Sequence, residues 1–424
     1  MTVLGNRSHD GGTRRAMFVS LDGLEDPLGR SQILPYVAGL ASRGHSMDLV
    51  TFEKPGVPAR FRSPIEEGIR WTSIPYIKRP WAVLNPLALA GIAPIQAVAS
   101  RTDLIHARSL GMAGLAMVLA GAFRIPFLCD SRGFWFDEKA DTGTLVLGSP
   151  AYRALKQIER ASYNRAAAIT VLTENARRYL HEEYMYAHER RAPIHLIPTC
   201  ADSDAFTPDG EQDAELKHAF ENTQALVYVG SMGTWYLADE MARFYLAFRT
   251  KVANPRFLVV TRDSAEPIAN VLRAAGVEHE LVVRSAKRDR VPGLLRLGVA
   301  GISFIRSTFS KRASAATKMG EYLASGLPVV ANDIGDVRRV LSEPGAGVHV
   351  EPDDDFEQAA AALVACMAAP ERAMRARQVA LRWFSLETAL DDYDALYRSM
   401  PDGSGATSSL PENVWPKPTK DANP

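Results

Sequence analysis

The sequence has little cysteine and no net charge. Its 424 residues include three cysteines (Cys129, Cys200 and Cys366), which lie far apart and provide neither a disulfide framework nor a CxxC metal pair. We therefore expect a reducing compartment such as the cytoplasm. Lys plus Arg total 49 and Asp plus Glu total 49. This balance argues against nucleic acid as the main partner, because phosphate binding needs a strongly basic face.

Long apolar runs are also scarce. Residues 1–15 are polar and lack the apolar centre of a signal peptide, so we do not expect a secreted protein. One uncharged stretch, residues 81–100, approaches bilayer length but is interrupted by prolines and a glycine. This pattern favours a buried helix. Because Lys78, Arg79 and Trp81 flank the stretch, peripheral contact with a membrane surface is the alternative.

Several catalytic signatures are missing. The sequence has no GxGxxG after a predicted strand, no Walker loop, no HExxH and no GxSxG elbow. These absences leave a dinucleotide oxidoreductase as a distant alternative. The acidic run Asp353-Asp354-Asp355 precedes a helical pattern and is predicted to be a charged N-cap, so we expect no metal site.

The chain contains short apolar runs that alternate with helical patterns. Strands are predicted at residues 16–21, 47–52, 69–76, 104–106, 126–130, 168–172 and 194–198, and then at 225–230, 257–261, 280–283, 299–305, 328–331 and 347–350. This alternation is typical of βαβ units and of parallel sheets covered on both faces. Turn-forming residues at 198–208 indicate a linker.

We therefore predict an α/β protein with two Rossmann-like, doubly wound domains facing across a cleft. The predicted segments are a flexible tail over 1–14, an N-terminal domain over 15–200, a C-terminal domain over 201–384, a last helix over 385–400, and a disordered Pro-, Gly- and Ser-rich tail over 401–424.

Two segments have the residue types of an anion site. Gly23 and Gly29 bracket the loop after the first strand, although an ordinary βα turn is equally open there. Farther on, Thr317, Lys318 and Glu321 share one helical face. Hydroxyls and a lysine at a helix start suit a diphosphate, and a carboxylate one turn later suits a ribose diol. The alternative is a solvent-facing Lys–Glu pair.

Longer motifs resemble those of glycosyltransferase family 4, which has the GT-B fold. The sequence ATKMGEYLASGLPVVAN (316–332) resembles the family's ribose-binding helix and the strand after it. Further similar segments are DLIHARS (103–109), DSRGFWFDE (130–138), VGSMGTW (229–235) and WFSLETALDDYDALY (383–397). The resemblance covers about residues 15–400.

The resemblance implies a retaining glycosyltransferase that needs no metal or other cofactor for catalysis. It would transfer a sugar from a UDP- or GDP-linked donor, held by the C-terminal domain, to a glycan, lipid-linked or small-molecule acceptor at the N-terminal domain. The last helix would pack back on the N-terminal domain. Such an enzyme would take part in the synthesis of a cell-surface polysaccharide or glycolipid, on the cytoplasmic side.

The resemblance also assigns site residues. Glu321 would bind ribose, Thr317 and Lys318 the diphosphate, and Gly29 would contact the phosphates through its backbone. Ser231 and Gly233 would border the nucleotide. The chain departs from the family at Ala313, where a first glutamate is common, and at Thr234 and Trp235, where an arginine and a lysine are common. Other cations must then neutralise the diphosphate, and the candidates are Lys318, Arg262 and Lys311.

Catalytic candidates come from the N-terminal domain. Asp130 and Arg132 follow a strand and replace a histidine that many relatives have there, and His106 ends the preceding strand. A structural Asp–Arg ion pair and a core histidine are equally open. Two other functions also stay open at this point. One is a nucleotide-sugar epimerase or hydrolase that uses Asp130, Asp137 and Glu138 as acid and base. The other is a non-catalytic nucleotide-sugar-binding subunit of a glycan assembly complex.

Overall fold

The structure, a computed structural model, describes residues 12–77, 90–94, 96–97, 101–184, 192–401 and 410–416. The chain divides into two compact units. The first comprises Met1–Ile197 and Glu387–Val414, and the second comprises Pro198–Leu386 and Trp415–Pro424. Most of the uncharged stretch 81–100, with Lys78 and Arg79 before it, lies outside the described residues. In the part that is described, no helix is long and apolar enough to cross a membrane.

Eight described strands form the sheet of the first unit, in the order β3-β4-β2-β1-β5-β6-β7-β8. Their bounds are β1 Arg15–Ser20, β2 Ser46–Glu53, β3 Arg60–Glu66, β4 Ile69–Pro75, β5 Leu104–Arg108, β6 Phe127–Ser131, β7 Ala168–Val171 and β8 Ile194–Leu196. All pairs are parallel except β3 with β4. The predicted parallel sheet is therefore confirmed, with one antiparallel edge strand added.

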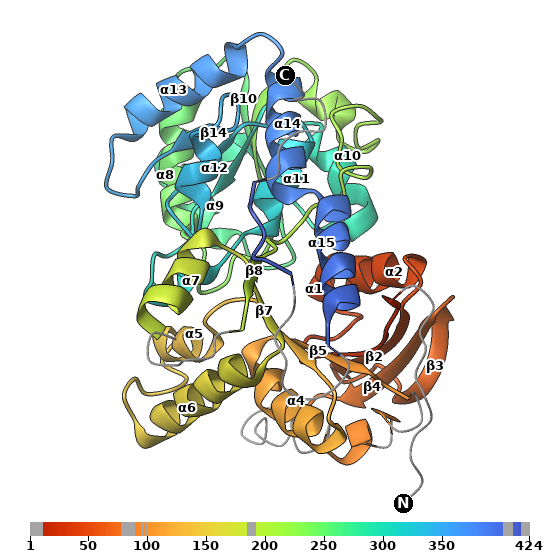
Figure 1. Cartoon of the computed structure of the whole chain (residues 1–424). Helices are drawn as coiled ribbons and strands as arrows, with labels where there is room; N and C mark the ends of the chain where they lie inside the picture. The colour runs from red at the N-terminus through yellow and green to blue at the C-terminus, as the bar shows by residue number, and fades with distance from the viewer. Residues whose placement is uncertain are drawn as a thin grey trace, which may run out of the picture. The chain divides into compact units, whose positions relative to one another are not determined.

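Helices cover both faces of this sheet. Figure 1 shows α2 on one face and α4 and α6 on the other. The described helices before the second unit are α1 Pro27–Gln32, α2 Leu34–Ser42, α4 Leu110–Phe123, α5 Trp135–Asp141, α6 Pro150–Arg165, α7 Glu174–Tyr179 and the π-helical turn η3 Leu180–Tyr184. α1 and α2 are separated at Ile33, two residues before Pro35, which lacks the N–H that a continuous helix needs.

The described sheet of the second unit has six strands, all parallel, in the order β11-β10-β9-β12-β13-β14. The strands are β9 Gln224–Val229, β10 Pro255–Val260, β11 Leu281–Arg284, β12 Ala300–Ser303, β13 Val329–Ala331 and β14 Gly347–His349. The helices are α8 Ala238–Arg249, α9 Glu266–Ala274, α10 Val291–Leu295, α11 Thr317–Ala324, α12 Val337–Leu341, α13 Phe356–Ala368 and α14 Arg372–Phe384. Short turns are η4 Lys217–Phe220, η5 Glu278–Glu280, η6 Arg288–Arg290 and η7 Phe309–Ala313.

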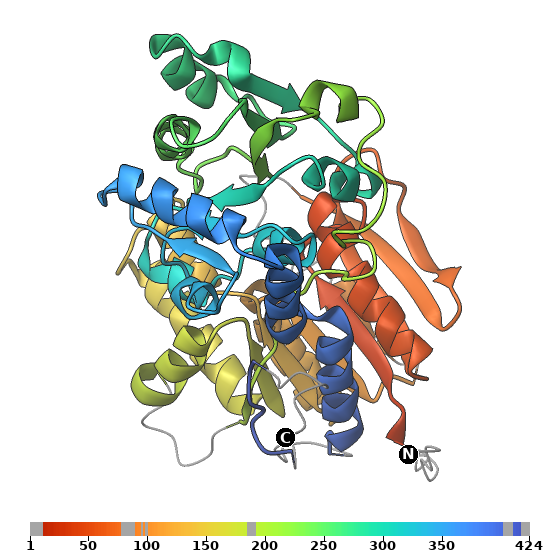
Figure 2. The ribbon, with the colours of Figure 1, turned by 90° about the horizontal axis from the view of Figure 1, so that it is seen from above.

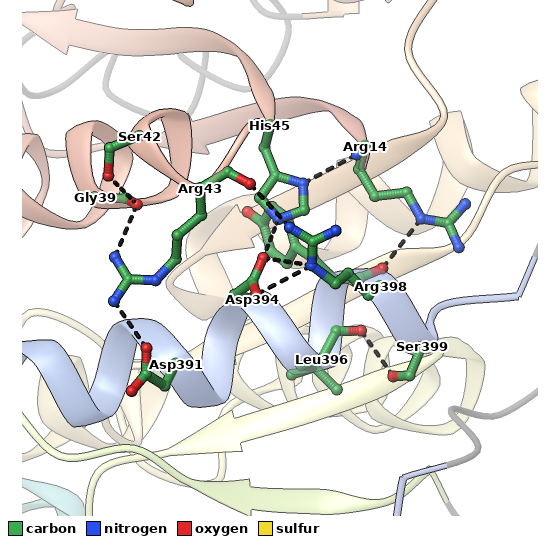
Figure 3. A network of polar contacts seen from close by, with 11 residues as sticks. Arg14, Gly39, Ser42, Arg43, His45, Asp391, Asp394, Leu396, Arg398 and Ser399 are labelled. Carbon is green, nitrogen blue, oxygen red and sulfur yellow. Dashed lines mark hydrogen bonds and ion pairs between the residues drawn. The ribbon is translucent and has the colours of Figure 1, made fainter. Parts of the chain in front are cut away.

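The last helix, α15 (Leu386–Ser399), belongs to the first unit from Glu387 onward. Figures 1 and 2 show it beside α2. Tyr393 meets Tyr36 of α2 edge to face, with ring centroids 5.8 Å apart. At the end of α2, Arg43 lies 2.8 Å from an Asp391 oxygen (Figure 3). Aromatic and ionic contacts therefore both hold the chain's last helix against residues near its beginning.

His45 adds a contact that depends on its protonation state. Its Nδ1 accepts a hydrogen bond from the backbone N–H of Arg14 at 2.9 Å, and its Nε2 lies 2.8 Å from Asp394 Oδ1 (Figure 3). Because an accepting Nδ1 carries no proton, this geometry specifies the neutral ring with the proton on Nε2. Burial lowers the pKa of His45, as do Arg398 and Arg14, while Asp394 opposes them.

We expect the first unit to lose stability in mild acid through His45. The pKa of His45 is lower in the folded than in the unfolded protein, so the free energy of unfolding falls as the pH drops through about 6.5. In His45→Gln the amide keeps an acceptor and a donor but does not titrate. Urea unfolding at about pH 7.5 and about pH 5.5 should show a smaller loss in the variant. An equal loss in both proteins would contradict this role.

Described residues fall within both predicted tails. Residues 410–416 lie within the tail predicted over 401–424, and the side chains of Glu412 and Asn413 form hydrogen bonds with β8. Asn413 donates to the Leu196 carbonyl at 2.9 Å and accepts from the Leu196 N–H at 2.7 Å, and Glu412 accepts from the Ile194 N–H at 2.9 Å. These side chains take the place of a neighbouring strand at the sheet edge. At the other end, the Arg14 guanidinium donates to the Tyr397 carbonyl at 3.0 Å, so residue 14 of the tail predicted over 1–14 contacts α15.

Candidate functional site

A glycine turn follows β9 in the second unit. Gly230 has a φ of 141°, which favours glycine, and a Cβ atom there would lie 2.7 Å from the Nζ of Lys318. Ser231 Oγ donates to Asp263 Oδ2 at 2.6 Å and accepts from the Gly233 N–H at 3.1 Å. Gly230, the first residue of the turn, therefore lies close to a lysine, and Ser231, the second, is hydrogen-bonded to a carboxylate.

Lys318 is buried near the start of α11. Its Nζ lies 3.1 Å from the Tyr228 hydroxyl oxygen, 4.2 Å from the centre of the Tyr228 ring and 3.9 Å from that of Tyr236. Desolvation lowers the pKa of Lys318 to about 7, against the opposing charge of Glu321. Aromatic faces stabilise a cation only in part, so this lysine can bind an incoming anion strongly.

A second lysine packs against the loop that continues from the glycine turn. The Nζ of Lys311, in η7, is 3.8 Å from the centre of the Trp235 ring. The Trp235 carbonyl accepts from the Arg306 N–H at 2.7 Å, which ties this loop to the end of β12. Next to Thr234 and Trp235, where the sequence departs from the family, lysines from η7 and α11 lie against the rings of Trp235 and Tyr236.

Glu321 lies one turn after Thr317 on α11 and is buried. Its Oε1 forms an ion pair with Arg288 of η6 at 2.7 Å. The Arg288 guanidinium in turn lies 4.6 Å from the centre of the Phe206 ring. The carboxylate predicted to bind ribose is thus held by an arginine that comes from the loop after β11.

Most of the predicted nucleotide-binding residues meet at one edge of the second sheet. Because its parallel strands end at the same edge, the loops after β9 and β12 and the start of α11 converge there. This places together Ser231, Gly233, Lys311, Thr317, Lys318 and Glu321. Arg262 follows β10 at this edge with an exposed side chain. Their contacts with a nucleotide stay predictions.

Gly29 lies in the first unit, and the structure gives it a packing role. A Cβ atom at this position would lie 2.0 Å from the Gly23 carbonyl oxygen and 2.7 Å from the Leu24 Cα. Only glycine lets α1 approach the turn after β1 this closely. The predicted backbone contact of Gly29 with phosphates stays a prediction.

The three catalytic candidates come together in the first unit, where they are enclosed. His106 Nδ1 lies 2.7 Å from the Tyr397 hydroxyl and His106 Nε2 lies 3.4 Å from Asp130 Oδ2. Thr170 donates to Asp130 at 2.8 Å, and Arg132 lies 3.7 Å from it. Burial lowers the pKa of His106, whereas Arg132 and His106 lower that of Asp130 despite its burial.

The space that this cluster lines is about 10 Å³, which is at the lower limit for one water molecule. A sugar therefore has no room among His106, Asp130 and Arg132 in this arrangement. The contact of His106 with Tyr397 favours the structural alternative, a polar core that holds α15. A catalytic role for the three residues stays a prediction.

Sequence reasoning missed the partners of the predicted residues. Arg288 and Asp263 belong to charged loops in which no spacing marks one residue. Tyr228 lies in the strand predicted over 225–230 and Tyr236 directly follows the segment 229–235, and neither was predicted to contact Lys318. The missing arginine and lysine after the glycine turn were the available signal, because a diphosphate site without them needs cations held from elsewhere.

Two family descriptions match the sequence. Residues 30–200 match the Glycosyl transferase 4-like domain, and residues 223–369 match Glycosyl transferases group 1. In three dimensions the chain is similar to sucrose-phosphate synthase (tll1590) from Thermosynechococcus elongatus, with a TM-score of 0.71 at 16% identity over 91% of this chain and 98% of the other. The chain belongs to the glycosyltransferases of the GT-B fold.

Other solved structures share the fold of this glycosyltransferase. Anabaena Alr3699/HepE in complex with UDP and glucose has a TM-score of 0.65 at 13% identity, over 90% of this chain and 98% of the other. Trehalose-6-phosphate from E. coli, bound with UDP-2-fluoro glucose, has a TM-score of 0.65 at 15% identity, over 91% and 99%. Comparison of the sequence with curated proteins finds no match.

Proposed function

We propose that this glycosyltransferase is a retaining enzyme of the hexosyltransferase type. It transfers a sugar from a UDP- or GDP-linked donor to a glycan, lipid-linked or small-molecule acceptor in the synthesis of a cell-surface polysaccharide or glycolipid. In this proposal the second unit binds the donor and the first unit binds the acceptor. No metal ion takes part.

The observation that carries the donor site is the position of Lys318. Its Nζ lies beside Gly230, 2.7 Å from the position that a Cβ atom would take there, and Glu321 follows about one turn later on the same helix. A diphosphate at the glycine turn would be within reach of this buried lysine, and a ribose would be within reach of the carboxylate. Thr317 supplies a hydroxyl at the helix start.

The transfer reaction requires positive charge beside the leaving diphosphate. When the bond between sugar and diphosphate breaks, the leaving nucleoside diphosphate gains negative charge. Preorganised donors and cations at that position lower the barrier, since they are already oriented when the charge develops. Lys318 and Lys311, each held on aromatic rings, are suited to this role. The UDP-containing complexes of similarly folded proteins point to the same class of donor.

The reaction type can be tested with a panel of UDP- and GDP-linked sugars. We expect one donor to release its nucleoside diphosphate slowly in water and much faster when an acceptor extract is added. Proton NMR of the early product should show the anomeric configuration of the donor. Fast, acceptor-independent consumption of the donor would instead favour the hydrolase or epimerase. Binding without turnover on any acceptor would favour a binding subunit.

We also propose that the enzyme acts on the cytoplasmic side of a membrane and contacts its surface through the basic and aromatic residues at the start of the uncharged stretch. The uncharged stretch and the flanking Lys78, Arg79 and Trp81 motivate this. Flotation with anionic vesicles should recover the wild type and less of a Trp81→Ala variant. Equal recovery of both would remove this part of the proposal.

A further inference from the structure

We propose that the protein occupies its own nucleotide site in the absence of ligand. Arg288 holds the carboxylate that binds ribose, and a nucleotide has to displace it. This inference rests on the proposed function, because it takes Glu321 as the ribose ligand. It adds a competitor within the chain that sets the affinity for the donor.

The ion pair between Arg288 and Glu321 is asymmetric in burial. The Glu321 side chain is 4% exposed, whereas that of Arg288 is 39% exposed, and the two atoms of the pair are 2.7 Å apart. A guanidinium presents parallel N–H donors to a carboxylate, and a ribose diol presents two hydroxyl donors to the same oxygens. Arg288 Nη2 contacts Oε1 of Glu321, so a ribose hydroxyl that donates to the same lone pair of this oxygen competes with the guanidinium.

The surroundings of Arg288 allow it to leave. The short turn that carries it is anchored by Arg290, whose guanidinium donates to Asp213 at 2.7 Å. The Arg288 guanidinium rests on the buried Phe206 ring at 4.6 Å and is open to solvent on its exposed part. A rotation of this one side chain thus frees the carboxylate without unfolding the turn. Once released, the guanidinium is hydrated, so its displacement costs mainly the ion pair.

The phosphate end of the site shows the same self-occupation. Asp263 Oδ2 accepts from the Ser231 hydroxyl at 2.6 Å and from the Met232 N–H at 2.8 Å. These hydrogen bonds lower the pKa of Asp263, which keeps it an anion. A hydroxyl and a backbone N–H at a glycine turn are the donors that a phosphate oxygen takes. The Asp263 carboxylate thus accepts the two hydrogen bonds that a bound phosphate would accept.

Removal of the competitor should therefore tighten nucleotide binding. In Arg288→Gln the free site no longer has to break an ion pair, so we expect the dissociation constant of the bound nucleoside diphosphate to fall about fivefold. Titration calorimetry with UDP, GDP and ADP measures this. The matched control is Lys287→Gln, which removes the same charge from the neighbouring exposed residue. We expect the control to bind as the wild type or slightly more weakly.

Thermal unfolding gives an independent measure. Without nucleotide, Arg288→Gln should melt below the wild type, because Glu321 loses its cation in a buried place. At a saturating nucleotide concentration the two melting temperatures should converge. A second variant, Asp263→Asn, removes the carboxylate charge at the glycine turn, so it should also bind the nucleoside diphosphate more tightly than the wild type.

The outcomes distinguish a failure of this inference from a failure of the proposed function. If the wild type binds a nucleotide and Arg288→Gln binds it equally or more weakly than Lys287→Gln, Arg288 is not a competitor and this inference is overturned while the proposed function stands. If neither wild type nor variants bind any of the three nucleotides, the proposed function fails and the inference fails with it. Tighter binding by Arg288→Gln alone supports the inference.

Discussion

Replacing Lys318 by methionine is expected to lower the rate of sugar transfer roughly 10²- to 10³-fold, the usual cost of removing one preorganised group from a developing charge. Methionine keeps the apolar contact with the rings of Tyr228 and Tyr236, so the fold should survive. Initial rates at saturating donor measure the effect. The matched control is Lys251→Met, because Lys251 lies on the surface beside Glu357, and this variant should keep the wild-type rate.

The same lysine makes nucleotide binding depend on pH. Its pKa is lowered to about 7 by burial, so it loses its proton as the pH rises above that value. A diphosphate binds the protonated form, and the affinity should therefore fall above about pH 7, by up to tenfold per pH unit. Lys318→Met should lack this dependence. A wild-type affinity that stays constant between about pH 7 and pH 9 would contradict a neutral Lys318 in the free site.

Replacing Glu321 by glutamine is expected to weaken nucleoside diphosphate binding by about 10- to 100-fold, because hydrogen bonds to a buried carboxylate contribute about 1.5–3 kcal/mol. The loss should come from the ribose. Wild type should therefore discriminate strongly against the 2′-deoxynucleotide, and Glu321→Gln should discriminate less. Calorimetry with both nucleotides measures this, with the exposed Glu266→Gln as control. Unchanged discrimination in Glu321→Gln would remove the ribose contact.

Much of the fold could be predicted from the sequence, because buried parallel strands leave continuous apolar runs. The strands over 16–21 and 225–230 were placed within one residue of β1 and β9. β3 was missed, since its residues RFRSPIE are mostly exposed at a sheet edge and show neither an apolar run nor a regular alternation. The contacts of Asn413 were hidden for another reason: one amide that pairs with a strand leaves no trace in the composition of a tail.

The candidate site could be predicted only where it is local. Lys318 and Glu321 share a helical face, and a spacing of three residues is enough to infer that. Arg288 contacts Glu321 from a different loop. Asp263, which follows β10, contacts Ser231, which follows the neighbouring strand β9. Such contacts depend on which strands are neighbours, which the periodicity of one sequence does not contain.

The central claim is that the edge of the second sheet around Lys318 binds a nucleoside diphosphate. Titration calorimetry of the wild type with UDP, GDP and ADP, repeated with Lys318→Met, tests it most directly. The account predicts that one nucleotide binds at one site per chain and that the variant loses most of the affinity. Equal binding by wild type and Lys318→Met, or no binding of any of the three by the wild type, would contradict it.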